Sequence, residues 1–443
     1  MTDLCEAGTS HTRMPPAVRS PRLVQALAFA LFRAKAMRRW IDRYGPLFEI
    51  NVPVFGRSVV VADAALAKSV CAARPDQLAN LEPSLGDWFG PGSTFALEGS
   101  RHRDQRRLLA TALHGVAMTN IDRVIEEATL RESANWPDNT ELRMLEPMNR
   151  ITLAVILQVA FGTDGRRLDG LVDIVAPYTR LGERLAFLPA PRGRARRISP
   201  WARLDELRTA FDRTVQTMIT AAYGDPDLAS RTDILAALVR ARGRNAMSEA
   251  DICDELLTLI CAGHGTSAAT LAWTFERLRR HPRVLAELVQ EAEEGGSSLR
   301  RATIMEAMRV RTVIDMFGRK VRSQGFDLGP WRIPDGRNVL VRVADLHRDP
   351  VVFPHPERFD PHRFLGVHAA PTWLPFGGGS RRCIGVGFAL AEMDVIVRTV
   401  LLNFEIHTDS APDENAVEMF AYVPGRGGRI MIKRRRSPTC RHS

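Results

Sequence analysis

The chain has 443 residues, of which 45% are hydrophobic and 25% charged, enough for a sizeable core. No Gly/Ser-rich linker, repeat or low-complexity block divides it, so we expect a single domain over residues 1–443. The formal net charge of +10 could steer an acidic protein partner. It does not predict a nucleic-acid-binding protein, because the only dense basic run at either end is residues 433–436.

The first predicted element is a partly buried helix over residues 23–32. This apolar stretch is too short for a membrane span, which needs roughly 20 apolar residues. The cysteines lack paired spacing, which favours a reducing compartment. We therefore expect a soluble, cytoplasmic protein without an anchor, with flexible tails at about 1–14 and 434–443. The six cysteines are Cys5, Cys71, Cys253, Cys261, Cys383 and Cys440.

Short apolar runs at 48–52 and 58–62 flank Gly56 and predict a β-hairpin. Residues from about 100 to 310 are helical in pattern. The longest helical run, 251–280, contains no proline and would extend roughly 45 Å before His281-Pro282 ends it. Short strands and proline-rich loops follow residue 313, and 389–404 is again helical. The predicted fold class is mainly α with small β-sheets.

Two Glu-x-x-Arg patterns place a carboxylate and a guanidinium on one helix face. They are Glu306–Arg309 and Glu276–Arg279. Spacing alone does not separate a buried pair from a solvated one, and we expect the Glu276 pair to be exposed. His102 and Arg106 also share a helix face, where the alternative is an ordinary solvated surface.

Cys383 lies in a glycine- and arginine-rich run between Phe376 and Gly385, directly before the helix predicted over 389–404. Glycines allow a backbone to approach a flat ligand closely. The positive charges of Arg381 and Arg382, together with the helix N-terminus, favour a thiolate. A bulky Phe376 could shield the sulfur. Such a thiolate suits a soft metal, and a haem iron is one candidate. The alternative is a glycine loop with an inert cysteine.

The run matches the haem-ligand signature Phe-x-x-Gly-x-Arg-x-Cys-x-Gly, and the chain resembles the cytochrome P-450 family from about residue 15 to 432. It looks most like soluble bacterial members, the actinobacterial and mycobacterial ones in particular. The resemblance implies haem b between the long central helix and the cysteine loop, with Cys383 as the iron ligand. The matching residues are Phe376, Gly379, Arg381, Cys383 and Gly385.

The resemblance also implies roles for polar residues outside the loop. Glu306, Arg309 and Arg358 would form a structural network that locks the segment leading to the ligand. His102, Arg106, Arg319 and Arg381 would hold the haem propionates.

A further match lies at the middle of the long helix, where two glycines each weaken a helix by about 1 kcal/mol. The family carries an acid–alcohol pair here that relays protons to dioxygen. Thr266 matches the alcohol, whereas Gly265 stands in place of the acid. His264 is adjacent but points about 100° away. The glycines alone could equally reflect close helix packing.

The function implied is a haem-dependent monooxygenase, an oxidoreductase that inserts one oxygen atom of O2 into a lipophilic small molecule. No flavin or nicotinamide motif is present, so a ferredoxin and its reductase would supply electrons. Because the acid is missing, two alternatives stay open. One is a peroxide-using or rearranging haem-thiolate enzyme, and the other is a catalytically quiet haem protein.

The resemblance also locates the expected substrate walls, whose residues core packing would explain nearly as well. The expected wall segments are 81–97, 171–188, 259–266, 313–317 and 420–423, with apolar Phe95, Leu97, Ile314, Met316 and Phe317. The substrate itself is not readable from the sequence.

Overall fold

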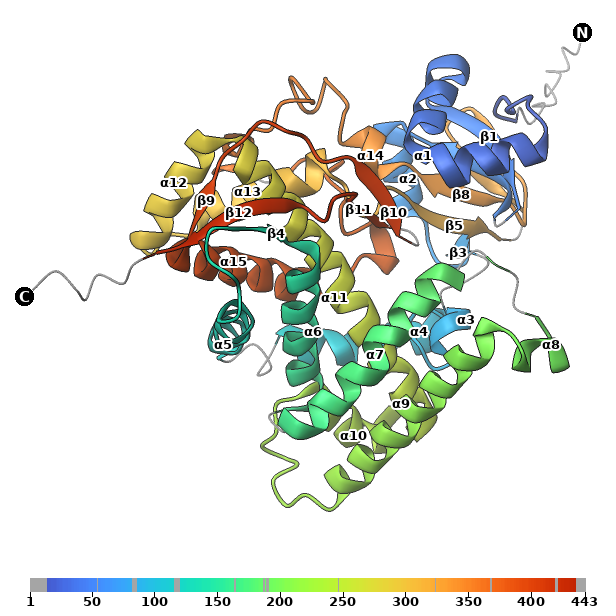
Figure 1. Cartoon of the computed structure of the whole chain (residues 1–443). Coiled ribbons are helices and arrows are strands. Elements are labelled where there is room, and N and C mark those ends of the chain that lie inside the picture. Colours follow the sequence, from blue (N-terminus) through green and yellow to red (C-terminus); the bar gives the residue numbers. More distant parts are fainter. Residues whose placement is uncertain are drawn as a thin grey trace, which may run out of the picture. The chain divides into compact units, whose positions relative to one another are not determined.

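The computed structural model describes residues 14–53, 55–81, 86–114, 120–162, 165–185, 188, 191–245, 247–322, 324–366, 369–418 and 421–435. Contacts divide the chain into two compact units. Unit 1 comprises Met1–Pro83, Met316–Leu346 and Gly378–Arg381, and unit 2 comprises Ser84–Asp315, His347–Gly377 and Arg382–Ser443. Both units draw on segments that lie far apart in the sequence (Figure 1).

Unit 1 is built on a five-stranded sheet in the order β1-β2-β8-β5-β3. β1 and β2 form the predicted antiparallel hairpin, in which Phe48 pairs with Val60. β2 runs parallel to β8, and the remaining neighbours are antiparallel. The strands are β1 (Leu47–Val52), β2 (Gly56–Val61), β3 (Leu78–Asn80), β5 (Phe317–Val321) and β8 (Asn338–Val341), and β6 (Phe326–Leu328) pairs separately with β7 (Trp331–Ile333).

The helices of unit 1 are α1 (Arg22–Tyr44), α2 (Ala64–Ala72) and the short α14 (Val343–Leu346), with one 3-10 turn at Gly379–Arg381. α1 extends the helix predicted over 23–32, and its backbone is kinked at Phe32. The helix is partly buried, as expected: Gln25 and Phe29 are covered, whereas most large apolar side chains of that stretch are exposed.

Unit 2 is mainly helical. Its helices are α3 (Gly86–Phe89), α4 (Gly99–His114), α5 (Ile121–Ser133), α6 (Leu145–Phe161), α7 (Gly165–Leu185), α8 (Arg194–Arg197), α9 (Pro200–Tyr223), α10 (Ile234–Asn245), α11 (Glu249–Arg280), α12 (Pro282–Glu293), α13 (Ser298–Val310) and α15 (Val386–Asn403), with a 3-10 turn at Pro361–Phe364. One large hydrophobic cluster joins α5, α6, α9, α11 and α15.

α11 confirms the long helix predicted from the sequence. It begins with a capping box, in which Ser248 and Asp251 each bond the other's backbone amide, and it ends before Pro282. By length and hydropathy it is the one described helix that could cross a membrane, but 72% of its most apolar window is buried in the protein. Packing inside unit 2 therefore accounts for its apolar character.

Two small antiparallel sheets complete unit 2, one in the order β4-β12-β9 and the other a β10-β11 hairpin. The strands are β4 (Thr140–Arg143), β9 (Phe404–His407), β10 (Asn415–Glu418), β11 (Ala421–Pro424) and β12 (Arg429–Arg434). β12 pairs with β9 as far as Arg434, which lies inside the predicted C-terminal tail. The other residues of both predicted tails lie outside the described residues, except Met14 and Arg435.

Candidate functional site

The Cys383 loop runs directly into α15. The backbone N–H of Cys383 donates to the carbonyl of Phe376 at 2.9 Å, and Gly385 is the residue before the first turn of α15. The Phe376 ring lies edge-on to Trp373, with ring centroids 6.0 Å apart. The helix begins at Val386, three residues earlier than predicted, so Cys383 lies closer to the helix N-terminus than the sequence indicated.

Cys383 is an exposed residue. Desolvation by the surrounding protein nevertheless raises its pKa, while the Gly385 backbone, Arg106 and Arg382 act in the opposite direction. The charge of Arg382 therefore favours the thiolate, as expected from the sequence, but burial acts more strongly in the opposite direction. Metal coordination would deprotonate the thiol, so an accessible cysteine beside two cations fits a haem iron.

Glu306 and Arg309 form a fully buried ion pair on α13, as predicted. Arg309 Nε lies 2.7 Å from Glu306 Oε2, and Arg309 Nη2 lies 2.8 Å from Oε1. Arg309 also donates to the carbonyls of His347 and Pro356, both at 2.8 Å, and to that of Arg358 at 3.0 Å. One guanidinium thus fastens the segment that follows α14 at three points.

The third side chain of this network is Arg363, whereas the sequence analysis assigned Arg358. Arg363 Nε lies 3.2 Å from Glu306 Oε1, which also accepts the Asp360 amide at 2.9 Å. Arg358 is exposed and contributes only its backbone carbonyl to the network. The signal was present in the sequence, because Pro-x-Arg-Phe occurs twice, at 356–359 and again at 361–364.

His347 extends the network to the segment before the cysteine loop. Its Nε2 accepts the Leu374 amide at 3.0 Å, and its Nδ1 lies 2.8 Å from the Thr312 hydroxyl. Burial, reinforced by the charge of Arg309, lowers the pKa of His347 to about 3. The ring is therefore neutral and can accept that amide. Trp373 Nε1 adds a bond to the carbonyl of Met305 at 3.3 Å.

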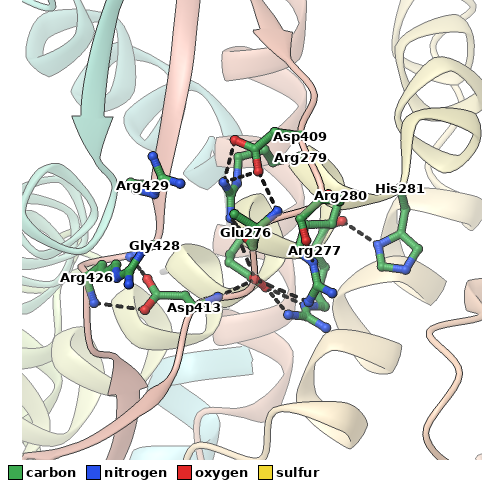
Figure 2. Close-up of polar contacts among 12 residues, drawn as sticks. Glu276, Arg277, Arg279, Arg280, His281, Asp409, Asp413, Arg426, Gly428 and Arg429 are labelled. Atoms are coloured by element: carbon green, nitrogen blue, oxygen red, sulfur yellow. Dashed lines mark hydrogen bonds and ion pairs between the residues drawn. The ribbon is translucent and has the colours of Figure 1, made fainter.

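The second Glu-x-x-Arg pair is also buried, which contradicts the expectation that it is exposed. Glu276 is 0% exposed and Arg279 is 1% exposed. Figure 2 shows Glu276 between the arginines of α11 and the chain near Asp413. Its Oε2 is paired with Arg277, and its Oε1 accepts the Asp413 amide at 3.1 Å. Glu276 and Arg279 do share one face of α11, as their spacing predicted. The spacing alone did not indicate that the protein core covers this face.

The middle of α11 presents one open turn. Ala262 and Thr266, four residues apart, are both exposed within a helix whose other positions are largely buried. A Cβ on Gly265 would meet nothing within 4 Å, whereas a Cβ on Gly263 would lie 3.2 Å from Ile156. Gly263 therefore serves close packing against α6, and Gly265 faces open space. The Thr266 hydroxyl donates to the carbonyl of Ala262 at 3.1 Å.

His264 lies in the core, away from that open turn. Its Nδ1 is 2.8 Å from the carbonyl of Ile260, and its own carbonyl accepts the Thr152 hydroxyl at 3.2 Å. Burial lowers the pKa of His264, so the imidazole is neutral and Nδ1 carries the donated proton. These contacts favour a packing role for His264 over a role in proton relay.

Glu392 on α15 is a carboxyl that the sequence analysis missed. Its side chain is fully buried, and neither carboxyl oxygen has a hydrogen-bond partner in the described part of the chain. Burial raises its pKa to about 8, which the nearby Ser267 hydroxyl partly opposes. Ser267 is buried on α11, so this uncharged acid lies on the covered side of the helix that carries exposed Thr266. The sequence did not indicate the burial of Glu392, because a single Glu in an apolar helix has no distinguishing pattern.

The four residues expected to hold propionates are divided between the units. In unit 2, His102 is buried on α4, and half-buried Arg106 bonds the carbonyl of Arg382. Burial lowers the pKa of Arg106. In unit 1, Arg319 bonds the carbonyl of Gly378 at 3.1 Å, and burial lowers its pKa to about 10. Arg381 ends the 3-10 turn of unit 1.

The expected substrate walls are only partly described. Phe95 stacks on Phe89 with ring centroids 5.9 Å apart, and Leu97 is buried, so packing explains both. Ile314 packs against the cluster of Trp273 and Val423. Met316 and Phe317 belong to unit 1. Phe420 and parts of the segments 81–97 and 171–188 lie outside the described residues.

Comparisons with known proteins agree on one family. The family model for cytochrome P450 matches residues 15–426. The chain is 48% identical to the Mycobacterium tuberculosis protein named cytochrome P450 138, over 96% of this chain and 97% of that protein. It is 34% identical to cytochrome P450 135B1 of the same organism, over 96% of this chain and 93% of that protein. Retinoic acid-bound cyanobacterial CYP120A1 superposes with a TM-score of 0.82 at 21% identity, over 96% of this chain and 100% of that chain.

The mainly helical fold carries an exposed cysteine on the loop directly before α15. The chain belongs to the cytochrome P450 family. It is accordingly an oxidoreductase of the monooxygenase type, and the family implies a haem-thiolate cofactor. The mainly α fold with small sheets, predicted from the sequence, is confirmed.

Proposed function

We propose that the protein holds haem b through the Cys383 thiolate and inserts one atom of O2 into a lipophilic small molecule. The observation that carries the proposal is the exposed thiol at the start of α15, beside Arg106 and Arg382. When bound, the haem supplies the oxygen chemistry. The protein supplies an ordered loop, and Thr266 offers a hydroxyl at an exposed turn.

The test is the absorption spectrum of the reduced protein with carbon monoxide. The full chain should show the long-wavelength Soret band typical of a thiolate ligand, and Cys383→Ala should lose it. Cys253→Ala and Cys261→Ala are the matched controls, since burial raises the pKa of Cys253 to about 12 and Cys261 lies on α11. Retention of the band in Cys383→Ala would refute the assignment.

We further propose that the protein is cytoplasmic and that electrons come from a ferredoxin and its reductase. The half-exposed and exposed cations Arg106 and Arg382 beside the cysteine loop suit an acidic carrier. Consumption of NADPH with purified ferredoxin partners, dependent on substrate, tests this. A spectral screen of lipids, terpenes, steroids and azoles would then identify the substrate class.

One observation favours a second candidate function. Gly265 stands where a proton-relaying acid is expected, which suits a peroxide-using or rearranging enzyme. The hydroxyl of Thr266, which is retained at the exposed turn, supports the monooxygenase. Turnover with hydrogen peroxide but not with NADPH and ferredoxin would establish the second candidate. A haem protein inactive under both conditions would instead bind or sense a ligand.

A further inference from the structure

The N-terminal helix α1 is fixed in unit 1 by one face. The Gln25 side chain is buried, donates to the carbonyls of Val18 at 3.1 Å and Ser20 at 2.8 Å, and accepts the Asn51 amide at 2.7 Å. Phe29 lies edge-on to Phe55, with ring centroids 6.1 Å apart. Rotating α1 about its axis would break these contacts, so the opposite face is held outward.

That outward face is apolar along the first half of α1. Its large side chains follow helical spacing, so they form one stripe. Exposed fractions are 75% for Leu23, 52% for Val24, 61% for Leu27, 66% for Leu31 and 61% for Phe32. Elsewhere in the described chain, exposed large hydrophobic residues are mostly scattered in sequence, such as Ile198 and Val351. A contiguous exposed apolar stripe on a helix whose other face is fixed marks an interaction surface.

The same face becomes basic beyond the kink at Phe32. Lys35, Arg38, Arg39 and Arg43 are all exposed. None of these four forms an ion pair with a carboxylate within the described residues. Residues 19–43 contain seven basic residues and one acid, Asp42. Figure 1 places α1 alongside β1 in unit 1.

We propose that the exposed face of α1 binds the surface of an anionic lipid bilayer. Its apolar half would enter the boundary between headgroups and acyl chains, and its basic half would contact anionic headgroups. A second copy of this chain fits less well, because two such basic faces would repel each other. This is peripheral binding rather than a span, since the apolar half is about half the length that a membrane span requires.

The test is flotation of the full-length haem-loaded protein with vesicles. We expect binding to equimolar phosphatidylglycerol and phosphatidylcholine at about 0.05 M salt and loss at about 0.5 M salt. Leu27→Ser/Leu31→Ser should weaken binding at least about tenfold. Lys35→Glu/Arg39→Glu should do the same. Val351→Ser, which removes an 89% exposed side chain from unit 2, is the matched control and should bind as the wild type does.

Three outcomes would overturn the proposal. One is equal binding of the Leu27→Ser/Leu31→Ser variant and the wild type. Another is a dimer, measured by light scattering, that this variant converts to a monomer, because a second copy would then cover the stripe. The last is vesicle binding that appears only after removal of residues 1–13, which would make that segment the natural cover. Because the stripe is exposed, the serine variant should retain the wild-type Soret band, which checks that it folds.

Discussion

At the scale of single residues, the strongest constraint is the paired burial of Glu306 and Arg309. A buried carboxylate can stay charged only while each of its oxygens accepts hydrogen bonds from nearby donors. Glu306 Oε1 has three donors, from Arg309, Asp360 and Arg363. Removing one donor leaves charge that the interior cannot solvate, so replacing Arg363, the second arginine on Glu306, should have a measurable effect on stability.

Arg363→Ala should lower the free energy of unfolding by about 3 kcal/mol and reduce the yield of haem-loaded protein, because Glu306 loses a charged partner. Arg358→Ala should change the unfolding free energy by no more than about 0.5 kcal/mol, because its side chain is exposed and its carbonyl remains. Chemical denaturation of both variants measures the difference. The reverse order of the two effects would restore Arg358 to the network.

These arginines also show what the sequence could and could not predict. The sequence predicted correctly that Cys383 lies directly before a helix, because an apolar helical pattern follows the glycine-rich run. The Arg358 assignment failed because two successive Pro-x-Arg-Phe patterns look alike, and only the folded loop decides which guanidinium turns inward. Glu392 could not be predicted, since its importance comes from burial against α11 rather than from any local pattern.

At the scale of elements, the C-terminal part of α11 anchors the chain around the β10-β11 hairpin (Figure 2). Glu276 accepts the Asp413 amide, and the Asp413 carboxylate accepts the amides of Arg426 at 2.9 Å and Gly428 at 3.1 Å. Trp273 Nε1 donates to the carbonyl of Tyr422 at 3.0 Å. The ends of α11 were predicted nearly correctly from the sequence. Its contacts with the chain around β10 and β11 could not be predicted from helical periodicity.

Glu276→Ala should destabilise the protein by about 3–5 kcal/mol, because it leaves Arg277 buried beside no carboxylate. Amide hydrogen exchange should quicken at Asp413, Arg426 and Gly428, whose cap depends on Glu276. Glu206→Ala is the control, since Glu206 and Arg203 form an exposed pair of the same spacing. If the two variants unfold at the same denaturant concentration, the buried cluster contributes no net stability.

At the scale of the whole molecule, two buried groups make stability depend on pH with opposite signs. His347 has its pKa lowered from 6.5 to about 3, so the unfolded chain takes up a proton first as pH falls. Stability is therefore lost from pH 6.5 downwards. Glu392 has its pKa raised from 4.5 to about 8, so the folded protein retains a proton that the unfolded chain has released. Stability is lost as pH rises through that range.

Glu392→Gln isolates the second effect, because a neutral amide of nearly the same shape replaces the neutral acid. The wild-type protein should lose stability relative to Glu392→Gln between about pH 5 and pH 8, by on the order of a few kcal/mol. Urea unfolding of both proteins at several pH values measures the difference, and acid denaturation driven by His347 cancels between them. Parallel pH profiles would mean that Glu392 is already ionised in the folded protein. It would then have to be paired with a cation or water.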